Sequence, residues 1–234
     1  MLGVALAQSS RALLMSAPHL VYGTAWKKEE TAYYVSEAVK AGFRCIDTAC
    51  QPRHYNEAGV GIGWTAAAEE LGLKRSDIWL QTKYTPIGGQ DPNNVPYDPK
   101  SPVAEQIRTS LGVSLKNLKT EYLDSWVMHS PLNSIEETVA AWRVMEEAVD
   151  EGRVHQLGIS NCYSLDNFRY LYQNARIKPK VGFDWAPYMT FNLHMSELCT
   201  LFFDLSEIRR FYKIDSIPIR TLIPSFASFA RKME

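Results

Sequence analysis

The stretch FRCIDTACQPRHYNEAGVGIGWTAAAEELGLKRSDIWLQTK, residues 43–83, contains one complete strand–helix–strand unit. Its apolar runs, FRCID and IWLQTK, have the length of buried strands, and a helical pattern over 57–71 separates them. Each run stops at a charged residue, Asp47 in the first and Lys83 in the second. Strands that alternate with helices pair in parallel through right-handed crossovers, so this stretch predicts a parallel α/β sheet.

The same rhythm extends outward from this unit in both directions. Gly42 and Gly152 stand just after helical patterns, where glycine accommodates a left-handed turn, and Ser134 with Glu137 forms a capping-box pattern. No G-x-G-x-x-G follows the first strand, so a doubly wound dinucleotide fold is disfavoured and a (β/α)8 TIM-barrel type is favoured. The predicted strands are 19–24, 43–47, 78–83, 122–129 and 154–160, and the predicted helices are 29–41, 57–71, 102–118, 134–151 and 165–175.

The rhythm fails after Lys178. A sixth strand is predicted in KPKVGFDWAPYMTF, residues 178–191, and a further helix over 206–214, but the remaining residues are too few for three more units. We therefore predict an incomplete barrel of about five to six and a half strand–helix units. It forms one domain over 19–234, irregular after about residue 181.

Residues 1–18 form an N-terminal extension in this interpretation. They contain no acidic residue, two consecutive serines and one arginine, a composition shared with transit peptides. A frayed extension is the preferred interpretation, and an organelle-targeting segment is the alternative.

Composition excludes several classes of partner. Lys and Arg number 25 against 26 Asp and Glu, so electrostatics does not favour nucleic acid. No stretch approaches the ~20 apolar residues of a membrane span. We expect a cytoplasmic protein with no nucleic-acid partner, no membrane partner and no metal site.

The cysteines show no C-x-x-C spacing and are predicted to be buried free thiols, with a disulfide or zinc site as the alternative; they are Cys45, Cys50, Cys162 and Cys199.

The segment TPIGGQDPNNVPYDPK, residues 85–100, leaves the predicted strand that contains Lys83. It is rich in Gly, Pro, Asn and Asp and too long for a simple connection. Long loops without regular structure are usually functional or mobile, so we predict a substrate-side loop rather than a linker.

Polar residues stand where four predicted strands end. They are Asp47, Lys83, His129 and the pair Ser160 and Asn161, and Tyr55 follows the first of them by eight positions. Each also has an ordinary structural interpretation when it is taken singly. In the order Asp47, Lys83, His129 and Tyr55, these are a helix cap, a solvated charge, a core histidine and a packed ring. A barrel gathers the carboxyl ends of its strands around one mouth, so their joint placement favours an enzyme site.

These residue types suit the reduction of a carbonyl group. A hydride that reaches the carbonyl carbon leaves an alkoxide, which needs a proton and electrostatic stabilisation. Tyrosine is a poor acid at its ordinary pKa of about 10, and a nearby ammonium shifts that value downward. Lys83 would supply the ammonium to Tyr55, and Asp47 would hold Lys83 by an ion pair. His129 would donate a hydrogen bond to the carbonyl oxygen, and the side chains of residues 160–161 suit a nicotinamide carboxamide.

Several motifs in order resemble the aldo-keto reductase family, in the subgroup with a GGQDP-type loop. They are YGTAWKKEET, GFRCIDTA followed by HYNEAGVGIG, LQTKYTP followed by GGQDP, and LGISN, and they cover about residues 19–180. That family is a (β/α)8 barrel that reduces aldehydes and ketones with NADPH. The resemblance implies a catalytic tetrad in which Tyr55 donates the proton and His129 also contacts the substrate; its members are Asp47, Tyr55, Lys83 and His129. It implies cofactor contacts from Thr24, Ala25, Asp47, Ser160 and Asn161.

The resemblance ends near residue 181. The family's glutamine segment, its seventh strand and the late basic segment that binds the adenosine 2′-phosphate have no counterpart here. We therefore predict a C-terminally truncated or divergent reductase with a small carbonyl substrate and weak NADPH affinity. We also predict self-association through open barrel edges, one of them the strand over 19–24. The alternatives are a binding or regulatory protein on this scaffold, as the potassium-channel β-subunits are, and an inactive fragment.

Overall fold

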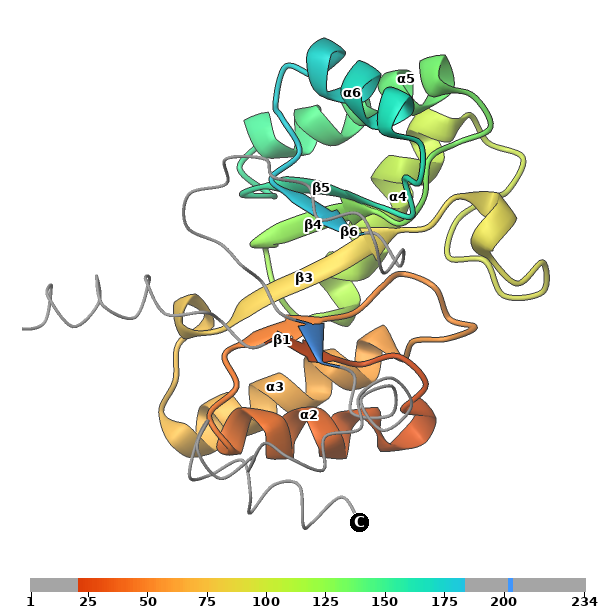
Figure 1. The fold of residues 1–234 in the computed structure, drawn as a ribbon. Helices are drawn as coiled ribbons and strands as arrows, with labels where there is room; N and C mark the ends of the chain where they lie inside the picture. The colour runs from red at the N-terminus through yellow and green to blue at the C-terminus, as the bar shows by residue number, and fades with distance from the viewer. Residues whose placement is uncertain (1–20, 184–201, 204–234) are drawn as a thin grey trace, which may run out of the picture.

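The computed structural model of the chain describes residues 21–183 and 202–203 (Figure 1). Its strands form one parallel sheet in the order β6-β5-β4-β3-β2-β1-β7. From β1 to β6 each strand pairs with the next one along the chain, which is the order of a barrel and not that of a doubly wound sheet. The strands are β1 Val21–Gly23, β2 Cys45–Asp47, β3 Trp79–Tyr84, β4 Ser125–Met128, β5 Leu157–Ser160, β6 Val181–Phe183 and β7 Phe202–Phe203.

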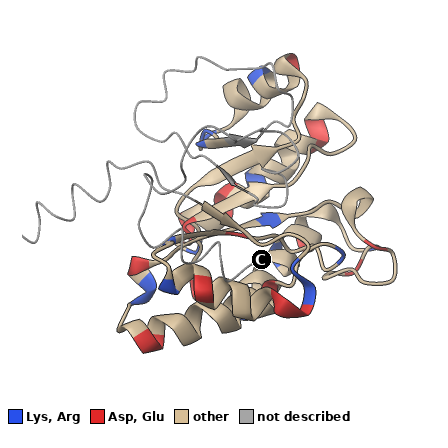
Figure 2. Ribbon diagram, turned by 60° about the horizontal axis from the view of Figure 1, so that its bottom comes forward, with Lys and Arg blue, Asp and Glu red and all other residues tan. Residues whose placement is uncertain are grey.

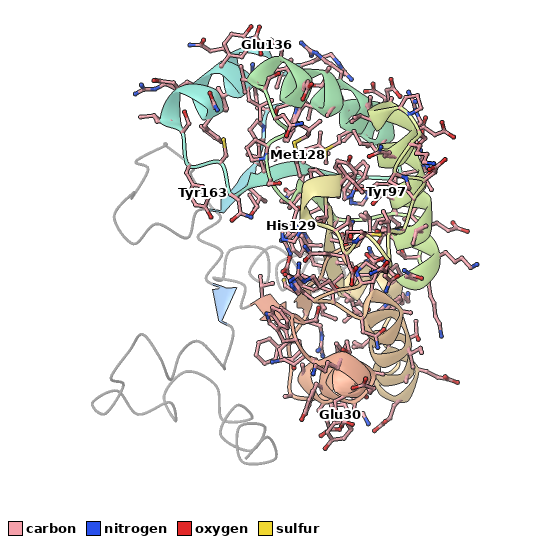
Figure 3. The ribbon with its side chains drawn as sticks, turned by 90° about the vertical axis from the view of Figure 1, so that its right-hand side faces the viewer. Glu30, Tyr97, Met128, His129, Glu136 and Tyr163 are labelled. Carbon is pink, nitrogen blue, oxygen red and sulfur yellow. The ribbon has the colours of Figure 1, made fainter. Side chains whose placement is uncertain are left out.

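The helices lie outside the strands and follow the sheet as an arc (Figure 3). In Figure 1, α2 and α3 cover the end of the sheet near β1, and α4 to α6 cover the other end. The predicted helix over 57–71 is confirmed at both bounds, and the other four agree to within two residues. The helices are α2 Thr31–Lys40, α3 Glu57–Leu71, α4 Val103–Asn117, α5 Ile135–Asp150 and α6 Leu165–Asn174, with short 3-10 helices η1 Lys28–Glu30, η2 Arg75–Asp77 and η3 Ile87–Gly89.

Two strands begin three residues later than predicted. The predictions over 122–129 and 154–160 become β4 and β5, and Leu123 and Val154 form only an isolated bridge. At this entrance the carboxylate of Asp124 accepts the backbone N–H of Leu80 at 2.8 Å. A side chain thus completes the hydrogen bonding that a regular ladder would supply, and the apolar pattern alone does not reveal it.

The core lies between the sheet and its helices. The four residues of β4 and the four of β5 are all buried, as expected for parallel strands covered by helices. Trp126 and Trp142 are among the largest fully buried side chains. The indole of Trp142 donates to the carbonyl of Ile177 at 2.9 Å, which ties α5 to the segment that leads into β6.

The predicted helix ends are confirmed where the structure describes them. Gly42 has φ of 107° and Gly152 has φ of 71°, both in the region that favours glycine. The Ser134 side chain accepts the Glu137 N–H at 3.1 Å and so caps α5, which is the Ser134 half of the predicted capping box. The predictions for residues 1–18, the helix over 206–214 and Cys199 lie outside the described residues.

The first strand is not an open edge, and the prediction that it would be is wrong. β1 pairs in parallel with β7, Val21 with Phe202 and Tyr22 with Phe203. The two strands lie far apart in sequence, so the apolar run near 202 gave no sign of this partner. Self-association of the chain stays a prediction, but the edge of β1 is not its basis.

Charges of both signs are interspersed along the helices (Figure 2). Ion pairs connect neighbouring helices on the surface, such as Lys40 with Glu70 at 2.6 Å and Arg108 with Glu147 at 2.7 Å. Exposed pairs of this kind contribute little to stability, because water and salt screen the two charges. The fold therefore depends mainly on its buried apolar contacts.

Glycines in α3 let that helix approach its neighbours closely. A Cβ atom at Gly61 would lie 2.0 Å from the carbonyl oxygen of Asn117, at the end of α4. We expect Gly61→Ala to lower the free energy of unfolding by about 1–3 kcal/mol, because backbone must move to relieve the clash. Gly112→Ala in α4 is the matched control, since nothing lies within 4 Å of its Cβ position. Helix propensity should make that variant more stable by about 0.5–1 kcal/mol. Urea unfolding that ranks the two variants equally would contradict this packing.

Candidate active site

The predicted site residues lie at the carboxyl ends of neighbouring parallel strands. Asp47 is the last residue of β2, His129 follows β4 directly, and Ser160 is the last residue of β5. Lys83 is the next-to-last residue of β3, because that strand continues one residue further than predicted. Parallel strands bring these ends to one edge of the sheet, where Figure 3 labels His129 beside Met128 of β4.

Asp47 and Lys83 form a buried ion pair, as predicted. The Lys83 ammonium lies 2.7 Å from Oδ1 and 2.6 Å from Oδ2 of Asp47 and donates to the Thr48 carbonyl at 2.8 Å. The Gln81 amide also donates to Oδ1 of Asp47 at 2.7 Å. Asp47 is 7% exposed and Lys83 6% exposed, so both charges depend on these partners rather than on water.

The surroundings keep Lys83 protonated. Burial by itself lowers the pKa of Lys83, but the charge of Asp47 and the nearby Tyr55 and Glu57 outweigh burial and hold the pKa above its ordinary value. Glu57 is buried behind the site, and burial raises its pKa although Thr82 donates to its carboxylate at 2.6 Å. Lys83 is therefore a fixed positive charge at neutral pH.

Tyr55 comes from the loop between β2 and α3. Its ring centroid lies 5.3 Å from the Lys83 ammonium and 6.1 Å from the centroid of the His129 ring. The loop is held by Asn56, which caps α3 by accepting the Gly59 N–H at 2.9 Å. The cap fixes the backbone next to Tyr55 at the start of α3. The structure thus brings the four residues of the predicted tetrad together.

His129 is held on both its backbone and its ring. Its N–H donates to the Tyr84 carbonyl at 2.8 Å, and its Nδ1 lies 2.7 Å from the hydroxyl oxygen of Thr85. Burial, followed by the charge of Lys83 and by His54, lowers the pKa of His129 to about 3. The imidazole is neutral at pH 7, so one ring nitrogen donates a hydrogen bond and the other accepts one.

Ser160 and Asn161 lie beside His129 at the end of β5. Asn161 has φ of 54°, donates from Nδ2 to the His129 carbonyl at 2.7 Å and accepts from the Tyr163 hydroxyl at 2.7 Å. Ser160 is 4% exposed, and its hydroxyl makes no hydrogen bond to another described residue. A hydroxyl without a described partner at the mouth can donate to or accept from the polar edge of a carboxamide.

The two predicted contacts after β1 differ in what they offer. The Thr24 hydroxyl donates to the Asp47 carbonyl at 2.9 Å, so it joins the ends of β1 and β2 and is already engaged. Ala25 is half-buried next to it. A cofactor contact by either residue stays a prediction.

Sequence reasoning missed Trp26, which follows Ala25. The side chain is 61% exposed, its backbone has φ of 63°, and its ring packs against that of His54 with centroids 4.1 Å apart and the planes tilted by 37°. The backbone N–H of Trp26 also donates to the His54 carbonyl at 2.7 Å, which places the residue beside the Tyr55 loop. In the sequence, the only indication of a role for Trp26 is its position inside the motif YGTAWKKEET.

The long loop over 85–100 starts at the mouth and is anchored there. Gln90 donates to the carbonyl of Cys50 at 2.9 Å and to that of Thr85 at 3.2 Å. The Tyr97 hydroxyl also donates to the Thr85 carbonyl, at 2.7 Å. The loop is thus a packed structure that joins the Tyr55 loop to the end of β3, and a substrate-side role stays a prediction.

The cysteines and the potential metal ligands of the described residues show no further site. Cys45 and Cys50 are buried free thiols, as predicted, and burial raises the pKa of both to about 12; Cys162 is also free but only half-buried. Within 21–183 and 202–203 no three His, Cys, Asp or Glu side chains gather as metal ligands would. No helix in that part of the chain is long and apolar enough to cross a membrane.

Comparison with known proteins identifies the family. The model of the aldo/keto reductase family matches residues 19–191, and the chain belongs to that family. The NAD(P)H-dependent D-xylose reductase of Pachysolen tannophilus is 30% identical over 192 residues, which cover 71% of this chain and 55% of that protein. The methylglyoxal reductase DkgA of Salmonella typhimurium is 31% identical over 167 residues, 70% of this chain and 52% of that one.

A solved structure agrees with the fold. The aldo/keto reductase of Brucella melitensis superimposes with a TM-score of 0.56 at 30% identity, over 70% of this chain and 57% of that one. The predicted family and the barrel-type fold are therefore confirmed. The chain spans about half the length of the curated relatives it matches.

Proposed function

We propose that the chain is an oxidoreductase that reduces the carbonyl group of an aldehyde or ketone to an alcohol, with NADPH as cofactor. One observation carries the proposal. A lysine ammonium, buried against Asp47, lies beside the ring of a tyrosine and close to a neutral histidine at the mouth of a barrel-type sheet. Family membership supports the same chemistry.

In this proposal Tyr55 provides the proton that the reduced carbonyl oxygen needs. The fixed charge of Lys83 favours the phenolate that remains after proton transfer. Asp47 keeps the ammonium in place, since both carboxylate oxygens accept from it. Transfer of a proton by a positioned acid contributes about 10²–10⁴ in rate.

His129 orients the substrate in this proposal. A neutral imidazole can donate one hydrogen bond to a carbonyl oxygen without adding a second positive charge near Lys83. The ring contributes through its position, because Tyr84 and Asn161 hold its backbone from two neighbouring strands. The exposed indole of Trp26 is the apolar surface that a substrate side chain would meet.

The residues at the end of β5 fit the nicotinamide half of the cofactor. The Ser160 hydroxyl is available as a donor or acceptor, and Asn161 Nδ2 retains a second hydrogen beyond the one it donates to His129. When bound, a reduced nicotinamide supplies the hydride. NADPH rather than NADH is proposed from the family resemblance; the relative from Pachysolen tannophilus is named for NAD(P)H dependence.

The test is a titration of the purified chain with NADPH, followed by fluorescence, together with a turnover assay. We expect saturable binding and loss of NADPH absorbance when methylglyoxal or another small aldehyde is added. Saturable binding without turnover of any aldehyde or ketone tested would favour a binding or regulatory protein. Absence of both binding and turnover would overturn the proposal.

A further inference from the structure

Thr85 is buried next to His129 and has no part in the function proposed above. It is 2% exposed, it follows β3 directly, and its hydroxyl oxygen lies 2.7 Å from Nδ1 of His129. Either atom could donate in that hydrogen bond, because a hydroxyl and a neutral imidazole nitrogen both donate and accept. Which one donates decides where the histidine proton resides.

The burial of Thr85 decides the direction. No other described side chain or carbonyl accepts from the Thr85 hydroxyl, so Nδ1 of His129 is the acceptor available to its proton. If Nδ1 carried the proton, the buried hydroxyl hydrogen would be left without an acceptor, at a cost of about 1–3 kcal/mol. The hydrogen bond therefore runs from Thr85 to Nδ1.

We propose that Thr85 is a positioning residue that fixes the neutral His129 ring in the tautomer with its proton on Nε2. Because Nδ1 is occupied as an acceptor, Nε2 is left as the donor. The inference rests on the proposed function for its use, since only this tautomer donates from Nε2 to a substrate carbonyl. Its structural content, the tautomer, does not depend on any reaction.

The surroundings of Thr85 are built to keep this donor in place. Its carbonyl oxygen accepts from both Gln90 and Tyr97 of the 85–100 loop, at 3.2 Å and 2.7 Å. Tyr97 is itself 5% exposed. The loop thereby fixes the backbone of Thr85 from one side, and β3 fixes it from the other, so the hydroxyl meets Nδ1 with little freedom.

The backbone of His129 is equally fixed. Its N–H donates to Tyr84 and its carbonyl accepts from Asn161. Because the backbones of Thr85 and His129 are both held, the His129 ring cannot turn far from Thr85 without losing the hydrogen bond at Nδ1. Thr85 is thus the described residue through which the tautomer of His129 is set.

The decisive experiment is nitrogen NMR on the chain with ¹⁵N-labelled histidine, without cofactor. His129 is one of five histidines, and its signals are assigned by their loss in His129→Asn. We expect Nδ1 to show the shift of an unprotonated, hydrogen-bonded nitrogen and Nε2 that of a protonated one. In Thr85→Val, which keeps the shape but lacks the hydroxyl, the Nδ1 signal should move, and Thr85→Ser should restore it.

Two results would overturn the inference. One is a protonated Nδ1 in the unmodified chain, and the other is a Thr85→Val spectrum at His129 equal to that of the unmodified chain. A merely structural role for Thr85 would lower the melting temperature of Thr85→Val and leave both nitrogen signals in place. Because the spectra need neither NADPH nor substrate, failure of the reductase proposal would be seen separately, in the turnover assay.

Steady-state turnover tests whether this tautomer of His129 contributes to catalysis. Thr85→Val should reduce kcat by about tenfold, since one buried hydrogen bond that orients the donor is lost, with a smaller effect on KM. Thr85→Ser should recover most of that rate. Equal kcat values for the valine variant and the unmodified chain would separate the tautomer from catalysis and overturn its proposed use.

Discussion

Tyr55→Phe should lower the rate of carbonyl reduction by about 10²–10⁴-fold and leave the affinity for NADPH nearly unchanged. The substitution removes the hydroxyl that donates the proton and keeps the ring that lies 5.3 Å from the Lys83 ammonium and 6.1 Å from the His129 ring. Packing at the mouth is preserved, so the loss falls on the chemical step. The measurement is steady-state turnover, with NADPH fluorescence for binding.

Tyr33→Phe is the matched control, because Tyr33 lies on α2 with half of its surface exposed and is not part of the site. It should keep the rate of the unmodified chain. A Tyr55→Phe variant that retains activity within about threefold would remove Tyr55 from the acid role, since a genuine proton donor contributes far more. Loss of NADPH binding in that variant would instead indicate that the ring supports the cofactor site.

The sequence predicted that the candidate site residues would lie together, because the geometry of parallel strands does most of the placement. Once Asp47, Lys83 and His129 were assigned to the ends of successive strands, the pleat and the common strand direction brought them to one edge. The buried ion pair followed from two opposite charges at neighbouring strand ends. Helix bounds were equally predictable, since a cap such as Ser134 and a turn residue such as Gly152 mark them locally.

Contacts between segments far apart in sequence were not predictable in this way. The pairing of β1 with β7 joins residues 21–22 to 202–203, and a local sequence pattern does not indicate a partner that lies so far along the chain. The hydrogen bond from Thr85 to His129 joins two strand ends whose side-chain directions depend on the exact end of each strand. The sequence interpretation ended β3 one residue early, at Lys83, and so gave Thr85 no part in the site.

Backbone conformation explains why the sequence showed no sign of Trp26 and no sign of how Asn161 is held. Trp26 and Asn161 have φ of 63° and 54°, in a region that side chains other than glycine rarely adopt. Propensity therefore gives no hint that Trp26 turns outward and packs against His54. Both residues lie at the mouth, and unusual backbone conformations concentrate at functional sites. The structure thus adds to the predicted tetrad the residues that shape its surroundings.

Lys83→Met should abolish most of the reductase activity and also destabilise the fold. The ammonium is the partner of Asp47, whose side chain is 10% exposed, so its removal leaves Asp47 as a buried charge without its cation. Breaking a buried pair on one side costs about 3–5 kcal/mol, and we expect the lower end, because Gln81 still donates to Asp47. Urea unfolding measures this loss. In the residual activity, the basic limb of the pH–rate profile should move to higher pH, since the charge that favours the phenolate is gone.

The double variant Lys83→Met with Asp47→Asn separates the two effects. Neutralising the carboxylate removes the uncompensated charge, so the double variant should unfold at a higher urea concentration than Lys83→Met alone. Its activity should stay as low as that of the single variant, because the ammonium beside Tyr55 is still missing. A double variant that recovers activity together with stability would show that Lys83 acts by holding the fold and not by tuning the acid. A Lys83→Met variant with the pH–rate profile of the unmodified chain would lead to the same conclusion from the kinetic side.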